Sequence, residues 1–219
     1  MSFNKESLHK VHSRIEMANP DNLNEAQRVV YDKIVSGKRG KVVGPLRVVL
    51  HSPELADRWQ AIGEHLRFDT GLPSVITELA IIATGRFWNS QVEWVIHARI
   101  AAEVGVSGDI IEAIRTSTPP FLEDSLQALV YDFTRQVLEF GQVDDELYEA
   151  LLNSIGTKSL VELTAIIGYY SMVSMTLNVH HVPVPESENA RRLECVDHCP
   201  LRRTTPLPER IKVAADCDI

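Results

Sequence analysis

The segment from Lys158 to about His180 constrains the fold more than any other, because it is helical in pattern and apolar almost all the way round. A helix without a polar face usually packs against neighbours on several sides. We therefore expect a helical bundle around it, with part of this helix, or of a helix over 121–140, in contact with another subunit. Its apolar side chains are Leu160, Val161, Leu163, Ala165, Ile166, Ile167, Tyr169, Tyr170, Met172, Val173, Met175 and Leu177.

The rest of the chain also predicts helices rather than strands. Ser52, Pro53 and Glu54 are typical of a helix start, with a capping serine, proline at the first helical position and an acid in the first turn. The short β-branched run 42–50 has no pairing partner, so a short helix or turn is expected there. The predicted fold class is all-α, with about six to nine helices from their periodicity. The helices are expected over 22–36, 53–68, 73–87, 89–104, 107–115, 121–140, 144–155 and 158–180.

Length and composition predict one principal domain. The chain of 219 residues is long enough for one large domain or two small ones, and its hydrophobic fraction of 44% supports a substantial core. The helical pattern disappears after Pro185. We therefore expect a flexible N-terminus over 1–20, a helical domain over 21–185, and a C-terminal arm or disordered tail over 186–219.

Charge and cysteine usage narrow the possible partners. The formal net charge of -8 argues against nucleic acid or an anionic membrane surface as a partner. The first residues lack a signal-peptide core, and no apolar run is expected to span a membrane, so a cytoplasmic location is predicted. Cys195, Cys199 and Cys217 form an odd set near the C-terminus, which does not indicate a disulfide framework.

The stretch from Thr77 to Gly105 contains most of the ionisable groups that look deliberately placed. Glu93 and His97 are four residues apart, so they lie one turn apart on the same helix face. Glu78 precedes an apolar run, and a buried carboxylate needs a partner. Arg86, two turns further on, is a candidate for that partner.

Each of these residues has a structural interpretation beside a functional one. Ser90-x-x-Glu93 fits a capping box, and His97 could be a core histidine. Trp88 and Trp94 are more often core residues than ligand platforms. Functionally, a carboxylate near an imidazole raises the imidazole pKa and fixes its tautomer, so that the ring can transfer a proton near neutral pH.

Arg86 has a functional interpretation of its own. A guanidinium can hold a substrate carboxylate through two parallel hydrogen bonds. The sequence leaves this role open beside that of a partner for Glu78.

An internal repeat is also visible. When Glu78 is aligned with Glu162, His97 aligns with His181, because both Glu-to-His separations are nineteen residues. The charged pair carries most of the weight of this match. It predicts two related helical units that pack about a pseudo-twofold axis.

Residues 40–185 resemble the carboxymuconolactone decarboxylase and alkylhydroperoxidase-D-like (AhpD-like) superfamily. The similar motifs are HSPEL at 51–55, TELAIIA at 77–83, EWVIHARIAAEVGVS at 93–107 and ELTAIIGYYSMV at 162–173. The resemblance implies an all-helical AhpD-like bundle and a homo-oligomer, commonly a trimer or hexamer. The peroxidase branch has a C-x-x-C pair at the positions of Ser90 and Glu93. This chain lacks the pair, so the decarboxylase branch is the closer analogue.

The function predicted on this basis is a decarboxylase or lactone-processing enzyme, a carboxy-lyase, that acts on a small carboxylated ring compound without a cofactor or metal. His97 is assigned as the proton donor, Glu93 as the residue that orients it, and Glu78 as a second acid or a structural anchor. A His97→Gln variant is expected to keep the fold and its melting temperature. The candidate substrate-binding residues are Arg86, Trp88, Trp94 and Ser90.

Other functions remain open at this point. A thiol-dependent peroxidase or reductase could use Cys195 and Cys199 if the tail folded back onto His97. A non-enzymatic oligomer that binds a small molecule would need no chemistry from the acidic and imidazole side chains. Zinc binding by Cys195, His198 and Cys199 is weakly indicated, since only three ligands at irregular spacing are present.

Overall fold

The computed structural model describes residues 12–185, 191–194 and 204–212. Within these residues the architecture is all-α, and the only β pairing is an isolated bridge between Phe121 and Ile211. A short 3-10 helix, η2, precedes the first α-helix. The elements are η2 (Pro20–Asn22), α1 (Glu25–Ser36), α2 (Leu46–Val49), α3 (Pro53–Phe68), α4 (Ser74–Phe87), α5 (Gln91–Glu103), α6 (Gly108–Thr116), α7 (Ser125–Phe140) and α8 (Asp145–Val179).

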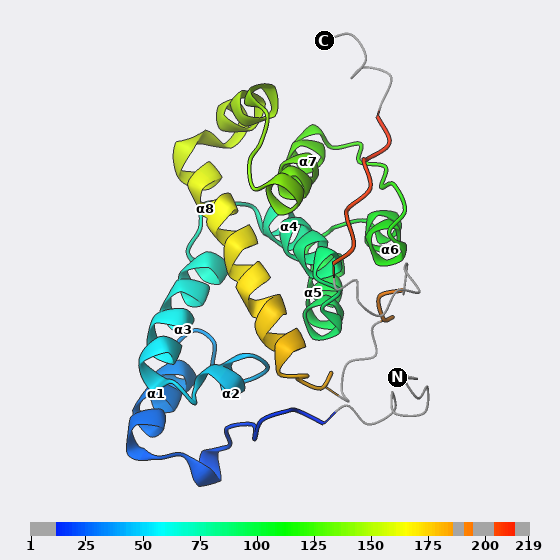
Figure 1. Ribbon diagram of the computed structural model, residues 1–219. Coiled ribbons are helices and arrows are strands. Elements are labelled where there is room, and N and C mark those ends of the chain that lie inside the picture. The colour runs from blue at the N-terminus through cyan, green and yellow to red at the C-terminus, as the bar shows by residue number, and fades with distance from the viewer. Residues whose placement is uncertain (1–11, 186–190, 195–203, 213–219) are drawn as a thin grey trace.

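Helix α8 separates two parts of the molecule, with α1–α3 on one side and α4–α7 on the other (Figure 1). Two helices were expected here, and the backbone is non-helical at Gly156, so α8 consists of two helical segments that meet at a kink; the φ of 76° at that residue suits glycine. Most of its apolar residues are buried, whereas Val161 and Met175 are exposed. In the part of the chain that the structure describes, α8 alone is long and apolar enough to cross a membrane, contrary to expectation, and 56% of its most apolar window is buried in the protein.

Helix α4 is the most deeply buried element. Every residue from Ile76 to Phe87 is buried, and α4 packs against α5, α7 and α8. Its apolar residues fall into two core clusters. One cluster joins α4 to α1–α3 and α8, and the other joins it to α5–α7. Polar side chains on such a helix can only contact protein groups, so Glu78 and Arg86 must find partners inside the fold.

The described parts of the C-terminal region pack against α4–α7. Leu193 and Leu207 are buried in the second core cluster. The backbone N–H of Thr205 donates to the carbonyl of Phe87, and the hydroxyl of Tyr131 donates to the carbonyl of Pro208. We call residues 191–194 and 204–212 the C-terminal arm. It completes the core of the α4–α7 part.

The N-terminal segment is also attached to the domain from residue 13 onward. The N–H of Arg14 donates to the carbonyl of His180, just after α8, and the N–H of Ala18 donates to the carbonyl of Arg47 in α2. Ala18 is buried. The expected boundary at residue 20 therefore divides a segment whose backbone already bonds to the helical domain; residues 1–11 lie outside the described part of the chain.

Candidate active site

Three ionisable side chains from α4 and α5 meet inside the protein. The Nδ1 atom of His97 lies 2.7 Å from Oε2 of Glu78, with which it shares a hydrogen bond. The Nε2 atom lies 3.0 Å from Oε1 of Glu93, one turn earlier on the same helix. None of the three side chains is more than 7% exposed. We call Glu78, Glu93 and His97 the triad. A histidine flanked by two buried carboxylates is well suited to carry a proton.

The turn between α4 and α5 brings the triad together. Asn89 has a left-handed φ of 51°, and the N–H of Ser90 donates to the carbonyl of Gly85. This reverses the chain so that α5 packs back along α4. Glu78 and His97 are at similar distances along the chain from the turn, so the two helices place them side by side.

The two carboxylates control the protonation of His97. Burial lowers the pKa of its imidazole, but the negative charges of Glu78 and Glu93 and their hydrogen bonds outweigh burial and raise that pKa to about 9. His97 is therefore protonated at neutral pH, and in that state its Nδ1–H donates to Glu78. The triad is prepared to give a proton rather than to remove one.

Tyr170 of α8 packs against His97 of the triad. Its ring lies edge-on to the imidazole of His97, with centroids 5.1 Å apart. Burial and the nearby carboxylates of Glu93 and Glu78 raise the pKa of Tyr170 well above its ordinary value, so the hydroxyl keeps its proton. Sequence reasoning gave Tyr170 no role. A tyrosine in an apolar helix was the available signal. A buried phenol needs a polar neighbour, so its presence indicates polar groups near that part of the helix.

Ser90 does not act as expected. It occupies the N-cap position of α5, but its side chain makes no capping hydrogen bond. Within the described residues its buried Oγ has no hydrogen-bond partner, and Glu93 faces His97 instead. The capping-box interpretation is therefore wrong, because the ion pair with His97 engages the carboxylate that a capping box would require.

Arg86 also differs from its predicted role as a clamp for substrate. The guanidinium is buried, and Nη1 donates to the carbonyls of Arg115 and Glu194 at 3.1 and 2.8 Å. Nη2 donates to the hydroxyl of Thr205 at 3.2 Å. These bonds hold the C-terminal arm to α4 and α6. We therefore place Arg86 outside the substrate-binding set, and the partner of Glu78 is His97.

The two tryptophans contribute mainly to packing. Trp94 is buried, and its Nε1–H donates to the carbonyl of Arg191 in the C-terminal arm. Trp88 packs edge-on against Phe87, and its carbonyl accepts from Asn178 of α8. Neither ring lines the two larger pockets described below.

The repeat in the sequence does not produce a second triad. His181 lies in a turn after the end of α8, with a left-handed φ of 51°, whereas His97 lies within α5. Glu162 instead accepts from the N–H of Gly71 and contacts His65 of α3. The two aligned Glu–His pairs therefore have different surroundings, because α8 ends before His181.

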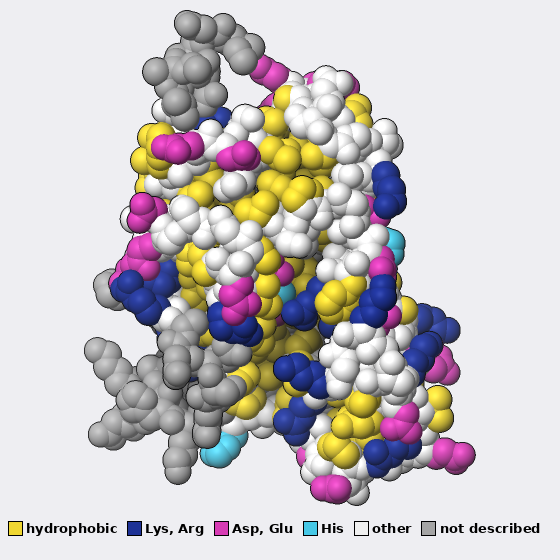
Figure 2. All heavy atoms as spheres, turned by 180° about the vertical axis from the view of Figure 1, so that it is seen from behind, with side chains coloured by type: hydrophobic (Ala, Val, Ile, Leu, Met, Phe, Trp, Pro, Cys, Tyr) yellow, Lys and Arg dark blue, Asp and Glu magenta, His cyan; other side chains and the backbone are white. Residues whose placement is uncertain are grey.

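Two pockets adjoin α5. The larger, of about 700 Å³, lies between the N-terminal segment, α2 and α5, and the other, of about 610 Å³, lies at the end of α8. They share Val92 and residues 182–184 as a common wall. Val92 and Ile96 of the larger pocket directly precede Glu93 and His97, although no triad residue lines either pocket. Figure 2, which shows the molecule from behind, has a hollow with Lys and Arg side chains around it.

No metal site is formed in residues 12–185, 191–194 and 204–212, where no group of His, Cys, Asp and Glu side chains is arranged to hold a metal ion. The zinc hypothesis for Cys195, His198 and Cys199 falls on residues outside the described part of the chain, as does the thiol hypothesis.

Solved structures show which fold contains this site. A peroxidase-related protein from Ralstonia eutropha JMP134, described as an alkylhydroperoxidase AhpD core, is 18% identical, with a TM-score of 0.65 over 81% of this chain and 94% of that chain. The chain has the AhpD-like fold. A peroxidase-related protein from Silicibacter sp. TM1040 is 14% identical, with a TM-score of 0.63 over 80% of this chain and 93% of that chain.

A protein of unknown function from Agrobacterium tumefaciens shares the AhpD-like fold over a smaller part of the chain. It is 18% identical, with a TM-score of 0.52 over 63% of this chain and 95% of that chain. No family model matches the sequence, and no curated protein matches it significantly. The predicted fold is confirmed by these structures, and identities this low carry the argument no further than the fold.

Proposed function

We propose that this protein is a decarboxylase or lactone-processing enzyme for a small carboxylated ring compound, with His97 as the general acid. The observation that carries the proposal is the imidazole of His97 buried between two carboxylates, with Nδ1 2.7 Å from Glu78 and Nε2 3.0 Å from Glu93, an arrangement that raises its pKa. Such a group is protonated at neutral pH and can deliver its proton to a reacting carbon. The chemistry needs only side chains of the chain itself.

Each member of the triad has a role in this scheme. Glu78 accepts the Nδ1–H of His97 and fixes the ring, which leaves Nε2 as the atom that gives up its proton. Glu93 stabilises the positive charge on the ring from the Nε2 side. After the proton leaves, solvent restores it. Glu93 thus both orients the ring and raises its pKa, as its position one turn before His97 predicts.

The reaction is balanced without an external oxidant or reductant. The bond between the ring carbon and the carboxylate breaks, carbon dioxide leaves, and the electron pair remains on the substrate as a dienolate. That pair then forms a carbon–hydrogen bond with the proton from Nε2 of His97. A protonated imidazole near the developing negative charge lowers the barrier to both steps.

The experiment is a turnover assay in deuterated buffer with carboxylated γ-lactones, carboxymuconolactone first, followed by NMR. Loss of the carboxylate with one deuteron incorporated at a carbon of the dienolate is the expected result. The rate should be constant at neutral pH and fall as pH rises through about 9, because His97 then loses its proton. A rate that rises over that range would identify a base instead and overturn the assignment.

The C-terminal arm determines how the thiol alternative should be tested. Deleting residues 190–219 would remove Leu193 and Leu207 from the core, so lost activity could simply reflect unfolding. Replacing Cys195, Cys199 and Cys217 by serine leaves the arm in place. Peroxide turnover with a dithiol donor that disappears in this triple variant would support a thiol peroxidase and contradict our proposal.

We also propose that the chain forms a homo-oligomer, as its apolar helix predicts. Val161, Met175 and Val179 are exposed on α8, at 64%, 41% and 52%. Their spacing places them along one side of the helix. Light scattering at micromolar concentration should show more than one subunit, and Val161→Glu should shift the protein toward the monomer.

A further inference from the structure

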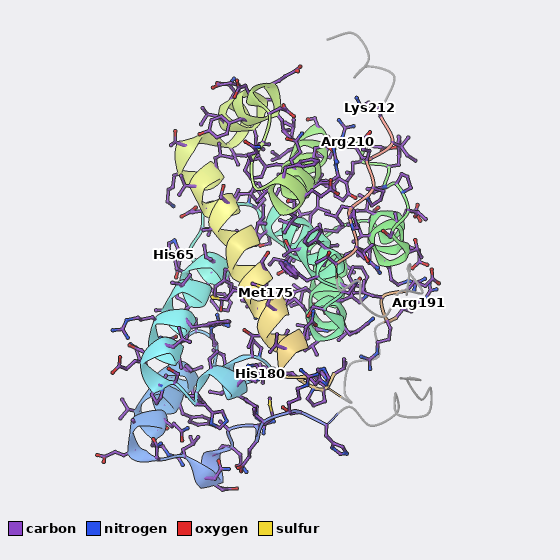
Figure 3. The ribbon with its side chains drawn as sticks, in the orientation of Figure 1. His65, Met175, His180, Arg191, Arg210 and Lys212 are labelled. Atoms are coloured by element: carbon purple, nitrogen blue, oxygen red, sulfur yellow. The ribbon has the colours of Figure 1, made fainter. Side chains whose placement is uncertain are left out.

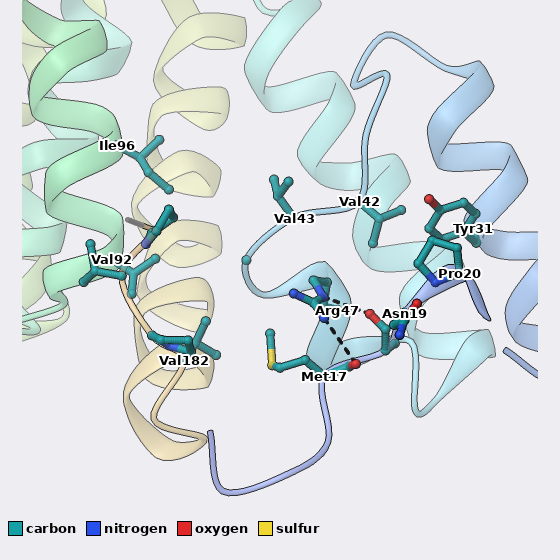
Figure 4. Close-up of a pocket in the computed structure, with 15 residues that line it drawn as sticks. Met17, Asn19, Pro20, Tyr31, Val42, Val43, Arg47, Val92, Ile96 and Val182 are labelled. Carbon is teal, nitrogen blue, oxygen red and sulfur yellow. Dashed lines mark hydrogen bonds between the residues drawn. The ribbon is translucent and has the colours of Figure 1, made fainter. Parts of the chain in front are cut away.

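The larger pocket beside α5 has one basic group in a mostly apolar lining, to which Asn19 and Tyr31 add polar atoms. Val43 lines it from the loop before α2, and Val92 and Ile96 line it from α5. Arg47 of α2 is the only charged residue in this lining. Figure 4 shows Arg47 directed into the space between α2 and α5. Pockets for small molecules commonly combine apolar walls with a few polar groups that fix orientation.

The guanidinium of Arg47 is held in place without being neutralised. Its Nε donates to the carbonyl of Ala18 at 2.8 Å, and Nη2 donates to the carbonyl of Met17 at 3.3 Å. No acidic side chain among residues 12–185, 191–194 and 204–212 forms an ion pair with it. These two bonds fix the plane of the group and leave Nη1 for a ligand. A positioned guanidinium with free donors matches the geometry of a carboxylate.

We propose that this pocket binds a small monocarboxylate with a flat apolar body, and that Arg47 binds its carboxylate. The proposal rests on the proposed function, because it supplies the carboxylate-binding residue that Arg86 was expected to provide. The pocket wall formed by Val92 and Ile96 is the same turn of α5 that carries Glu93 and His97. Arg47 therefore determines which substrates lie against that turn.

The volume and the lining favour such a ligand over a bare anion. A pocket of about 700 Å³ is far larger than a phosphate or acetate ion needs, and its valine, isoleucine and proline side chains stabilise only an apolar body. A ligand with both parts would place its carboxylate at Arg47 and its ring between Val43 and Val92.

The first test measures binding of benzoate by titration calorimetry, with benzamide, acetate and inorganic phosphate as comparisons. Benzamide has the same shape as benzoate but no charge, and the two ions lack the ring. Benzoate should bind most tightly. Equal binding of benzoate and benzamide, or of benzoate and inorganic phosphate, would overturn the proposal.

Two variants assign the binding to Arg47. Arg47→Gln should weaken benzoate about 10- to 100-fold, the usual loss for a hydrogen bond to a charged group, and leave benzamide unchanged. Arg58→Gln is the matched control, because Arg58 is exposed on α3 and bonds only to the carbonyl of Glu54. Unchanged benzoate affinity in a folded Arg47→Gln variant would contradict the proposal.

Arg47 also anchors the N-terminal segment, so a second variant avoids disturbing it. Val43 is 46% exposed at the pocket edge, and Val43→Glu adds a negative charge there without touching the bonds of Arg47. Benzoate should bind at least about 10-fold more weakly in this variant, while the melting temperature stays unchanged. Undiminished benzoate binding in Val43→Glu would exclude this pocket.

The failure of this inference can be told from the failure of the proposed function. His97→Gln removes the proposed acid but not Arg47, so it should keep benzoate binding. If benzoate binds through Arg47 while no lactone is turned over, the binding site stands and the decarboxylase proposal falls. If turnover is seen but Arg47→Gln changes neither benzoate affinity nor KM, the binding site falls.

Discussion

Two Glu–His pairs in this protein contain the same residue types in different surroundings. Glu78 and His97 are both buried and 2.7 Å apart, with Glu93 as a third member. Glu162 and His65 are 3.3 Å apart, and the side chain of His65 is 53% exposed. Figure 3 places His65 at the outer edge of α3. The difference teaches that the environment, rather than the pair itself, decides what such residues can do.

The partners of Glu162 explain why this second pair is structural. Burial raises the pKa of Glu162, but the hydrogen bond from Gly71 N–H, the ion pair with Lys158 and the contact with His65 together lower it. The carboxylate therefore anchors the loop before α4 to α8. In the triad, by contrast, the charge of two buried carboxylates acts on one imidazole whose side chain is only 5% exposed, and such interactions are stronger there.

The largest effect should separate the two histidines in catalysis. His97→Gln should reduce turnover of the true substrate about 100- to 10,000-fold, the usual contribution of a general acid. His65→Gln is the matched control and should leave turnover unchanged, because His65 is on the exposed side of α3. The measurement is kcat by NMR. Equal losses in both variants would contradict the distinction between the two pairs.

The same two variants should differ in stability. His97→Gln leaves two buried carboxylates without their cation, which typically costs about 3–5 kcal/mol in the free energy of unfolding. His65→Gln should cost less than about 1 kcal/mol, since the side chain of His65 is 53% exposed and Glu162 keeps its bonds to Gly71 and Lys158. Urea denaturation at pH 7 measures both. The buried triad thus changes the sequence-based expectation that His97→Gln would not affect the melting temperature.

The pH dependence of stability gives a third test. The pKa of His97 is raised from 6.5 to about 9 in the folded protein, so its contribution is complete below pH 6.5 and is lost as pH rises through about 9. The urea midpoint should therefore fall over this range in the wild type. Glu93→Gln removes one of the two negative charges and so lowers the folded pKa, so the decline should still begin near pH 6.5 but end at lower pH and be smaller. An unchanged profile in Glu93→Gln would show that Glu93 does not set the pKa.

Most of the fold could be predicted from local sequence signals. The start of α3 at Pro53 and its end at Phe68 match the expected bounds, because the proline and the acid beside it are local features. The break within α8 was predictable as well, because the two expected helices end and begin on either side of Gly156, where the backbone is non-helical. The packing of the C-terminal arm could not be predicted, because its sequence has no helical pattern and its position depends on tertiary contacts.

Contacts between site residues on the same helix could be predicted from the sequence, whereas contacts between segments far apart in the sequence could not. The pairing of Glu93 with His97 follows from their spacing, and the structure confirms that they lie on one face. The competing interpretation as a capping box had the same spacing and could not be excluded from sequence. The contacts of Arg86 could not be predicted, because its partners Glu194 and Thr205 come from the distant arm.

The smallest expected effect concerns Glu162. Glu162→Gln keeps an oxygen that can accept from Gly71 N–H, and it loses only ion pairs with the exposed Lys158 and His65, so it should cost less than about 1 kcal/mol at pH 7.

The pH dependence of the Glu162 contribution to stability has the opposite sign to that of His97. The pKa of Glu162 is lowered from 4.5, so its contribution is present above pH 4.5 and is lost as pH falls through the lower folded value. The variant should therefore match the wild type in its alkaline stability profile and differ only in acid. If Glu162→Gln changed the pH dependence of the urea midpoint between pH 7 and 10, the two Glu–His pairs would be coupled through α8.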